Sequence, residues 1–192
     1  RYLPGSGTPP TFITVDDGLA SNHVVSIYRD PAGTIWVGST VKGVTRIDNG
    51  QARPIDLGRS FTATAFVQDD QGRIWLGTEG QGIIVLEEGR EVQRFTETEG
   101  LLSNTIKALG RDQFGHVWIG TNKGLFVLPH GQTTSKVIPI PGAAVSRTPV
   151  FVPKSGKTLI TAIYADDDGV VHNVSIDAAG DALDQPSKGA PP

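Results

Sequence analysis

The stretch that decides the fold is Asp112–Thr121 (DQFGHVWIGT), because the chain contains this pattern three times. Earlier copies occupy Asp30–Ser39 (DPAGTIWVGS) and Asp69–Thr78 (DDQGRIWLGT). The tryptophans of the three copies lie 39 and then 43 residues apart, and the first aspartates and glycines keep the same intervals. A period near 40 residues, built from short apolar segments, is typical of repeat architectures. The sequence therefore predicts a series of similar structural units.

Each copy belongs to a plan of four short segments rich in β-branched and aromatic residues, which are typical of strands. In the first repeat these segments are Val24–Tyr28, Thr34–Ser39, Val44–Asp48 and Ala52–Asp56. The Asp-x-x-Gly turn joins the first two, because Asp can cap a turn and Gly can adopt a positive φ. Asn49-Gly50 indicates a hairpin between the last two. Four antiparallel strands per repeat are the anatomy of a β-propeller blade.

We therefore predict an all-β fold, a β-propeller of four-stranded antiparallel blades with three clear blades and a degenerate fourth. The expected organisation is an arm at 1–10, a propeller domain at 11–180 with repeats at 19–56, 61–95, 101–138 and 148–176, and a tail at 181–192. In the last repeat Asp166–Gly169 stands where the others have Asp-x-x-Gly, and His172 takes the place of Trp. An unrelated β-hairpin is the alternative for this segment.

The N-terminal segment Thr11–Val15 has the composition of a strand, and residues 13–22 repeat the pattern of residues 95–104. It therefore corresponds to an outer fourth strand that has no blade before it, whereas the last predicted blade has only three strands. We expect Phe12, Ile13 and Val15 to complete that last blade, in the same chain or in a neighbouring subunit. The second arrangement would produce a homo-oligomer by strand exchange.

Composition excludes several classes of protein. With 38% hydrophobic and 19% charged residues, the chain of 192 residues is neither disordered nor membrane-inserted. The net charge of −3 gives no reason to expect nucleic acid as a partner. The absence of cysteine excludes disulfides and thiolate metal sites. The absence of methionine leads us to expect a processed end or a longer parent chain.

The repeats resemble the two-component regulator propeller repeat. The resemblance rests on two Gly-Leu-x-Ser-Asn segments, Gly18–Asn22 and Gly100–Asn104, and on the three Asp-x-x-Gly-x-(Ile/Val)-Trp-x-Gly-(Ser/Thr) copies. It covers about Phe12 to Leu128, and the second repeat departs from it at Gly58–Phe61. Proteins with these repeats form extracytoplasmic sensor propellers that often respond to glycans. The resemblance thus implies propeller blades and an extracellular or periplasmic location, while a transmembrane helix and kinase motifs are missing from this sequence.

Six residues of the repeated motif are interpreted as structural. The tryptophans lie mid-strand between aliphatic residues, so we expect them to pack between blades rather than to stack on sugars. The glycine two residues after each tryptophan would permit close approach of a neighbouring strand. These residues are Trp36, Trp75, Trp118, Gly38, Gly77 and Gly120.

Candidate ligand-binding residues flank the first strand of a repeat, which lines the central channel of a propeller. They are Asn22, His23, Arg29, Asn104, Lys107 and Arg111. For the two asparagines, turn capping through side-chain-to-backbone hydrogen bonds is the alternative role.

The sequence indicates neither a catalytic centre nor a cofactor. Aspartate clusters such as Asp16-Asp17 lack the spacing of a calcium loop, and the four histidines lack metal-ligand spacing. We therefore predict a non-catalytic binding or sensor module for an extracytoplasmic small molecule, glycan or protein. The alternative is a structural protein that assembles through its N-terminal strand into an oligomer or filament.

Overall fold

The computed structural model describes residues 12–101 and 103–131, together with the backbone of strands at 136–138, 150–154, 159–165, 171–177 and 187–188. These residues form four separate antiparallel sheets of four strands each. The only helices among them are two 3₁₀ turns, η1 (Val15–Asp17) and η2 (Glu97–Glu99). The predicted fold class, an all-β propeller of four-stranded blades, is confirmed. No described helix is long and apolar enough to cross a bilayer.

Each sheet takes its strands in chain order, so we name the sheets blades 1 to 4. Blade 1 contains β1 (Val24–Arg29), β2 (Ile35–Ser39), β3 (Gly43–Asp48) and β4 (Gln51–Ile55). Blade 2 contains β5 (Ala63–Gln68), β6 (Ile74–Thr78), β7 (Ile83–Glu87) and β8 (Arg90–Phe95). Blade 3 contains β9 (Ile106–Arg111), β10 (Val117–Thr121), β11 (Gly124–Leu128) and β12 (Lys136–Ile138). Blade 4 contains β13 (Val150–Lys154), β14 (Leu159–Ala165), β15 (Val171–Asp177) and β16 (Ser187–Lys188).

Turn chemistry sets the register within blade 1. Asn49 and Gly50 have φ values of 50° and 80°, which is the conformation that a two-residue hairpin requires. Asp48 consequently pairs with Gln51 across β3 and β4. In blade 2 the same two-residue turn is made by Glu88 (φ 51°) and Gly89 (φ 80°).

Apolar layers between adjacent blades form the core. Trp36 and Val44 of blade 1 pack in one cluster with Phe66, Leu76 and other residues of blade 2. In the next layer, Trp75 of blade 2 packs in a cluster with blade 3. Alternate residues of one strand therefore face opposite neighbours, as strand geometry requires.

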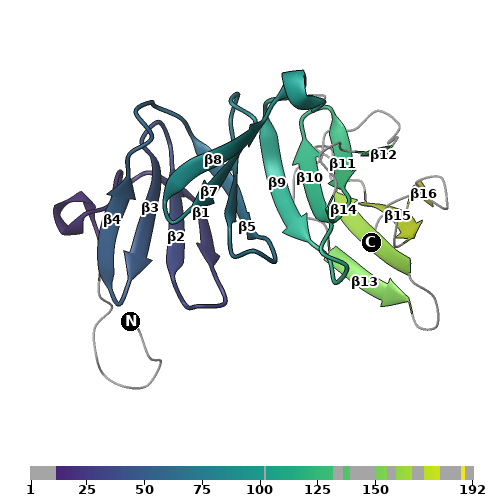
Figure 1. Ribbon diagram of the computed structural model, residues 1–192, viewed down its shortest axis with the longest axis horizontal. Coiled ribbons are helices and arrows are strands. Elements are labelled where there is room, and N and C mark those ends of the chain that lie inside the picture. The colour runs from purple at the N-terminus through teal and green to yellow at the C-terminus, as the bar shows by residue number, and fades with distance from the viewer. Residues whose placement is uncertain are drawn as a thin grey trace.

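The blades stand side by side with their first strands together, since β5 contacts both β1 and β9. Figure 1 shows them spread along the longest axis of the molecule, with blade 1 at one end and blade 4 at the other. The result is an open arc whose two end blades lie far apart.

The prediction that Thr11–Val15 forms a strand is wrong for its described part. Phe12 to Thr14 belong to no sheet, and Val15 begins η1. Thr14 caps η1 by accepting a hydrogen bond from the Asp16 amide, and Asp17 accepts one from the Thr14 amide. This reciprocal capping favours a 3₁₀ turn over an extended strand. The N-terminal segment therefore does not complete blade 4 in this chain, and its pairing with a neighbouring subunit stays a prediction.

Blade 4 differs from its predicted plan in two respects. It has a fourth strand, β16, which lies within the predicted tail at 181–192 and pairs with β15. Residues 166–170 lie between the second and third strands of the sheet along the chain, whereas the Asp30, Asp69 and Asp112 turns join first and second strands. His172 accordingly lies on a third strand, not at the position of the tryptophans. The Asp166–Asp168 turn and the arm at 1–10 lie outside the described residues.

Candidate functional site

A groove of about 860 Å³ runs along the concave side of the arc, where the first strands of blades 1, 2 and 3 lie together. The groove is formed by β1, β5 and β9 and by the turns that follow them. Its polar and aromatic lining includes Ser26, Tyr28, Thr64, Asp70, Lys107 and Arg111. Most ligand sites occupy such concave surfaces, which makes this groove the leading candidate.

A β-bulge at the same position of each of these three strands shapes the groove. The pairing with the second strand skips one residue in every case: Val25 in β1, Thr64 in β5 and Lys107 in β9. A bulge residue is left out of the regular ladder and its side chain is re-aimed. Thr64 and Lys107 line the groove. Val25 is not part of the lining, so the bulges bring a threonine and a lysine, but not the valine, to the groove.

Two aromatic rings form part of the groove wall. Tyr28 and Phe66 stack with ring centroids 6.5 Å apart and an angle of 19° between their planes. Burial raises the pKa of the Tyr28 hydroxyl above its ordinary value, so the phenol is neutral at physiological pH. The hydroxyls of Ser26 and Thr64 already donate hydrogen bonds to the protein itself. Their acceptors are the carbonyls of Ala63 and Ile106, which lie on the first strand of the next blade. These two bonds tie neighbouring blades together.

Lys107 is the groove's unpaired cation among the described residues. It is exposed and makes no described ion pair, whereas the other cation of the lining, Arg111, pairs with Asp70. The carboxylates of the lining are all engaged: Asp69 with Arg73, Asp70 with Arg111, and Asp112 with Trp118. Among the described residues of the lining, Lys107 is therefore the charged group that is both exposed and without an ion-pair partner.

Asp70, Arg111 and His130 form a polar cluster between blades 2 and 3. Asp70 contacts the Arg111 guanidinium with one carboxylate oxygen, and its other oxygen lies 3.3 Å from His130 Nδ1. Gly115 makes room for the cluster, since a Cβ atom there would lie 2.8 Å from His130 Nδ1 and 2.9 Å from Asp70 Oδ2. Asp70 lines both the groove and a smaller cavity of about 300 Å³ beside it. The cluster holds the turn of blade 2 against blade 3.

The two predicted asparagines bond to the first residues of the 3₁₀ turns that precede blades 1 and 3. Asn22 Oδ1 accepts a hydrogen bond from the Val15 amide at 3.0 Å, and Asn104 Oδ1 accepts one from the Glu97 amide at 2.9 Å. The Asn104 carbonyl also accepts bonds from Gly80 and Gly82 in blade 2. Neither asparagine lines the groove. The geometry thus favours capping for both.

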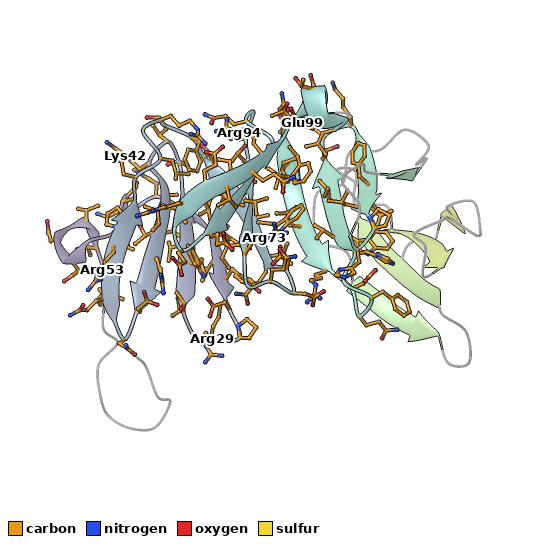
Figure 2. All side chains as sticks on the ribbon, viewed as in Figure 1. Arg29, Lys42, Arg53, Arg73, Arg94 and Glu99 are labelled. Atoms are coloured by element: carbon orange, nitrogen blue, oxygen red, sulfur yellow. The ribbon has the colours of Figure 1, made fainter. Side chains whose placement is uncertain are left out.

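The remaining predicted ligand residues fall into separate places. His23 precedes β1, while Arg29 ends it at the opposite end of the sheet. Figure 2 shows Arg29 at the lower end of the blades and Glu99 at the upper end. Five residue steps along a strand span roughly 16 Å. One small ligand therefore cannot contact both ends, and of the six predicted residues only Lys107 and Arg111 line the groove.

The repeated motif forms the same hydrogen-bonded pair in all three blades. The indole Nε1 of Trp36, Trp75 and Trp118 donates to the aspartate six residues earlier, at 3.1, 2.9 and 2.8 Å. The three tryptophans are at most 4% exposed. Burial by itself would raise the pKa of Asp69, but hydrogen bonds from Trp75 and Arg73 outweigh it and hold the pKa below its usual value.

Two of the three glycines that follow the tryptophans lie against a neighbouring strand. A Cβ atom on Gly38 would lie 2.3 Å from the Ala63 carbonyl oxygen, and one on Gly77 would lie 2.7 Å from Ile106 Cγ2. Gly120 is buried in β10. These contacts leave no room for a side chain and keep the blades close.

Sequence reasoning missed Tyr28, Thr64, Asp70 and His130 as groove or cluster residues. Tyr28 and Thr64 belong to strands that were predicted, but strand periodicity does not reveal a bulge. Asp70 and His130 are distant in the chain and meet only after blades 2 and 3 pack. Among the described residues no group of three or more potential metal ligands is present.

The arc of four-stranded sheets, with first strands lining a concave groove, defines a β-propeller protein. The two component regulator propeller family matches residues 18–40, 58–80 and 100–123. These three segments, a little over a third of the chain, are similar to two-component regulator propeller repeats. No curated protein matches the chain.

Solved structures share the fold. The extracellular domain of BT4673 from B. thetaiotaomicron, described as a one component system, superposes with a TM-score of 0.61 at 18% identity, over 92% of this chain and 30% of that one. The Dos1 propeller gives 0.63 at 13% identity, over 85% and 49%. An ancestral GH74 enzyme gives 0.59 at 15% identity, over 89% and 26%. This chain thus spans between about a quarter and a half of these proteins.

Proposed function

We propose that this chain is a non-catalytic binding module of an extracytoplasmic sensor, and that it recognises its ligand in the concave groove. The observation that carries the proposal is the unpaired Lys107, presented by a β-bulge beside the Tyr28–Phe66 wall. A neutral phenol and one available cation suit a hydroxylated, negatively charged ligand. An acidic oligosaccharide has this chemistry.

The family repeats support a sensor role, and the extracellular domain of BT4673 supports an extracellular or periplasmic location. The GH74 enzyme shows that a related fold also supports glycan hydrolysis. Hydrolysis of that kind ordinarily needs two available carboxyl groups flanking the scissile bond. In the described lining of the groove, each aspartate already forms an ion pair with an arginine or accepts a hydrogen bond from a tryptophan. Binding without turnover is therefore the function that the groove supports.

Titration calorimetry with an oligogalacturonate as the probe tests this proposal, with a neutral cello-oligosaccharide of the same length for comparison. We expect saturable binding of the acidic probe and weaker binding of the neutral one. Lys107→Ala should weaken acidic-probe binding about tenfold, the effect of losing one charge-assisted contact of about 1.4 kcal/mol. Lys42→Ala is the matched control, because Lys42 is exposed on a loop away from the groove.

Three outcomes would contradict the proposal. One is the absence of saturable binding of either probe. Another is equal affinity of wild type and Lys107→Ala for the acidic probe. The third is release of reducing ends from the acidic probe during prolonged incubation, which would reveal catalysis and exclude a binding module.

A further inference from the structure

The ion pair between Asp70 and Arg111 lies in the lining of the groove and is open to water. Asp70 belongs to the turn after β5, and Arg111 is the last residue of β9, so the pair bridges blades 2 and 3. The two side chains are 49% and 29% exposed, respectively. Exposed ion pairs are weak, because water and salt screen the attraction between the two charges. An anion that enters the groove can therefore compete with Asp70 for the guanidinium.

Asp70 has fewer partners than the other carboxylates of the groove. Asp69 and Asp112 each accept hydrogen bonds from backbone amides of their own turn and from the indole of a tryptophan. The described contacts of Asp70 are Arg111 and His130, whose Nδ1 lies 3.3 Å from the second carboxylate oxygen. Asp70 can therefore leave Arg111 without opening its turn, and it keeps a polar neighbour in His130.

Arg111 has donor capacity that the ion pair does not use. A guanidinium presents several N–H donors in one plane, and two of them can bind one carboxylate side by side. Among the described residues Asp70 is the acceptor for Arg111 Nη2, while the buried Nε of Arg111 has no acceptor. Burial raises the pKa of the Tyr28 hydroxyl, and the charge of Arg111 offsets part of this rise. The guanidinium and the phenol therefore lie within electrostatic reach of each other.

Lys107 and Arg111 place two cations along the same strand of the groove. They are four residues apart in β9, and both belong to the lining. Four residue steps of a strand span about 13 Å. An acidic monosaccharide carries its carboxylate at one point, whereas a chain of acidic sugars repeats the carboxylate along its length. The two cations therefore match two carboxylates of one acidic chain better than they match a single acidic sugar.

We propose that Arg111 is a second anion-binding residue of the groove, and that a carboxylate of the ligand takes the place of Asp70 on its guanidinium. This inference rests on the proposed function, since it concerns the same acidic oligosaccharide in the same groove. Lys107 binds one carboxylate of the chain, and Arg111 binds another that belongs to a different sugar unit. Asp70 occupies Arg111 in the ligand-free groove and so lowers the affinity for the acidic chain.

Titration calorimetry with hexagalacturonate tests this exchange. Arg111→Gln should weaken binding about tenfold, the effect of losing one charge-assisted contact. Asp70→Asn should tighten binding about two- to fivefold, because it removes the competing carboxylate of an exposed ion pair. The double variant should bind like Arg111→Gln alone. Arg59→Gln is the matched control and should bind like wild type: Arg59 is also 29% exposed and pairs with Glu91, but it is not part of the lining.

The sign of the Asp70→Asn effect separates exchange from a structural role. If Asp70 only oriented Arg111, its removal would weaken binding. If Asp70→Asn tightened binding equally with and without Arg111, the effect would be the general loss of a negative charge. Either result, or unchanged affinity in Arg111→Gln, would overturn the inference.

Two further comparisons complete the test. Circular dichroism checks that each variant is folded; should Arg111→Gln unfold, Arg111→Lys keeps the charge but not the planar pair of donors, and it should still weaken binding. Wild-type binding that depends on Lys107 but not on Arg111 would overturn this inference and leave the proposed function standing. Absence of hexagalacturonate binding by wild type would overturn both.

Discussion

At the scale of single residues, the aspartate–tryptophan pair explains why the repeated motif has its particular spacing. Asp112 accepts amide hydrogen bonds from Phe114 and His116 with one carboxylate oxygen, and the indole of Trp118 donates to the other. One buried side chain thus closes the turn and fixes the orientation of the largest core residue. The spacing of Asp, Gly and Trp in the repeated motif follows from these hydrogen bonds.

Removing the indole donor should therefore destabilise the blade although the ring volume is largely kept. Trp118→Phe leaves one oxygen of the buried Asp112 carboxylate without its indole donor, and an unsatisfied buried polar group costs about 1–3 kcal/mol. Urea unfolding followed by circular dichroism measures the change. Asp16→Asn is the control, because Asp16 is exposed on η1, and it should change the unfolding free energy by less than about 0.5 kcal/mol. Equal stability of Trp118→Phe and wild type would show that the pair contributes little.

At the scale of elements, strand positions followed from hydrophobic patterning and turn chemistry, because both act locally. The first strand was predicted at Val24–Tyr28 and is found at Val24–Arg29. The prediction of an N-terminal strand was wrong because Thr14 and Asp17 form a capping box, which amino-acid composition alone does not reveal. The same box recurs at Thr96 and Glu99 before η2. The sequence match between residues 13–22 and 95–104 is therefore a match between two segments that contain the same capped 3₁₀ turn. It does not show that the N-terminal segment is a strand.

The groove was harder to predict than the strands. Lys107 and Arg111 were anticipated from their positions near the first strand of a repeat. Thr64 was not, since its exposure to the groove depends on a bulge created by pairing with β6. The Asp70–Arg111 contact joins residues 41 positions apart and exists only because two blades pack. Non-local contacts of this kind leave no local trace in a single sequence.

A glycine comparison tests how tightly the outer strand of blade 2 packs. Gly82 and Gly50 have φ values of 73° and 80°, so alanine at either position should cost about 1–2 kcal/mol from the backbone alone. A Cβ atom on Gly82 would also lie 2.0 Å from the Phe95 carbonyl oxygen, whereas one on Gly50 meets nothing within 4 Å. Thermal unfolding should therefore show Gly82→Ala to be less stable than Gly50→Ala by a further 1–3 kcal/mol, roughly. Equal stabilities of Gly82→Ala and Gly50→Ala would contradict the close contact between Gly82 and Phe95.

At the scale of the whole molecule, the arc gives its blades unequal environments. Blade 2 has a neighbour on both faces, and every residue of β6 is buried. Blade 1 has a described neighbouring blade on one face, and three hydrophobic residues of β1 are at least 40% exposed. Free energies of local opening follow the extent of packing. Stability should therefore be distributed unevenly along the chain.

Amide hydrogen exchange measured by mass spectrometry can detect this distribution. In dilute protein, peptides covering Ile74–Thr78 should exchange at least tenfold more slowly than peptides covering Val24–Arg29. The difference arises because opening β6 exposes two apolar layers and opening β1 exposes one. Uniform exchange across both segments would mean that the arc unfolds as one cooperative unit.

The three bulges have a consequence for how such a protein can diversify. Val25, Thr64 and Lys107 differ in size, polarity and charge, yet each stands at the same step of an otherwise regular blade. A bulge residue is excluded from the ladder, so strand pairing does not fix its identity, although the Thr64 hydroxyl still donates a hydrogen bond to the next blade. Successive copies of the repeat could therefore acquire different side chains there while the scaffold stayed constant. An engineer who wished to change what the groove accepts would begin at Lys107, which lines the groove, and would leave the tryptophans alone.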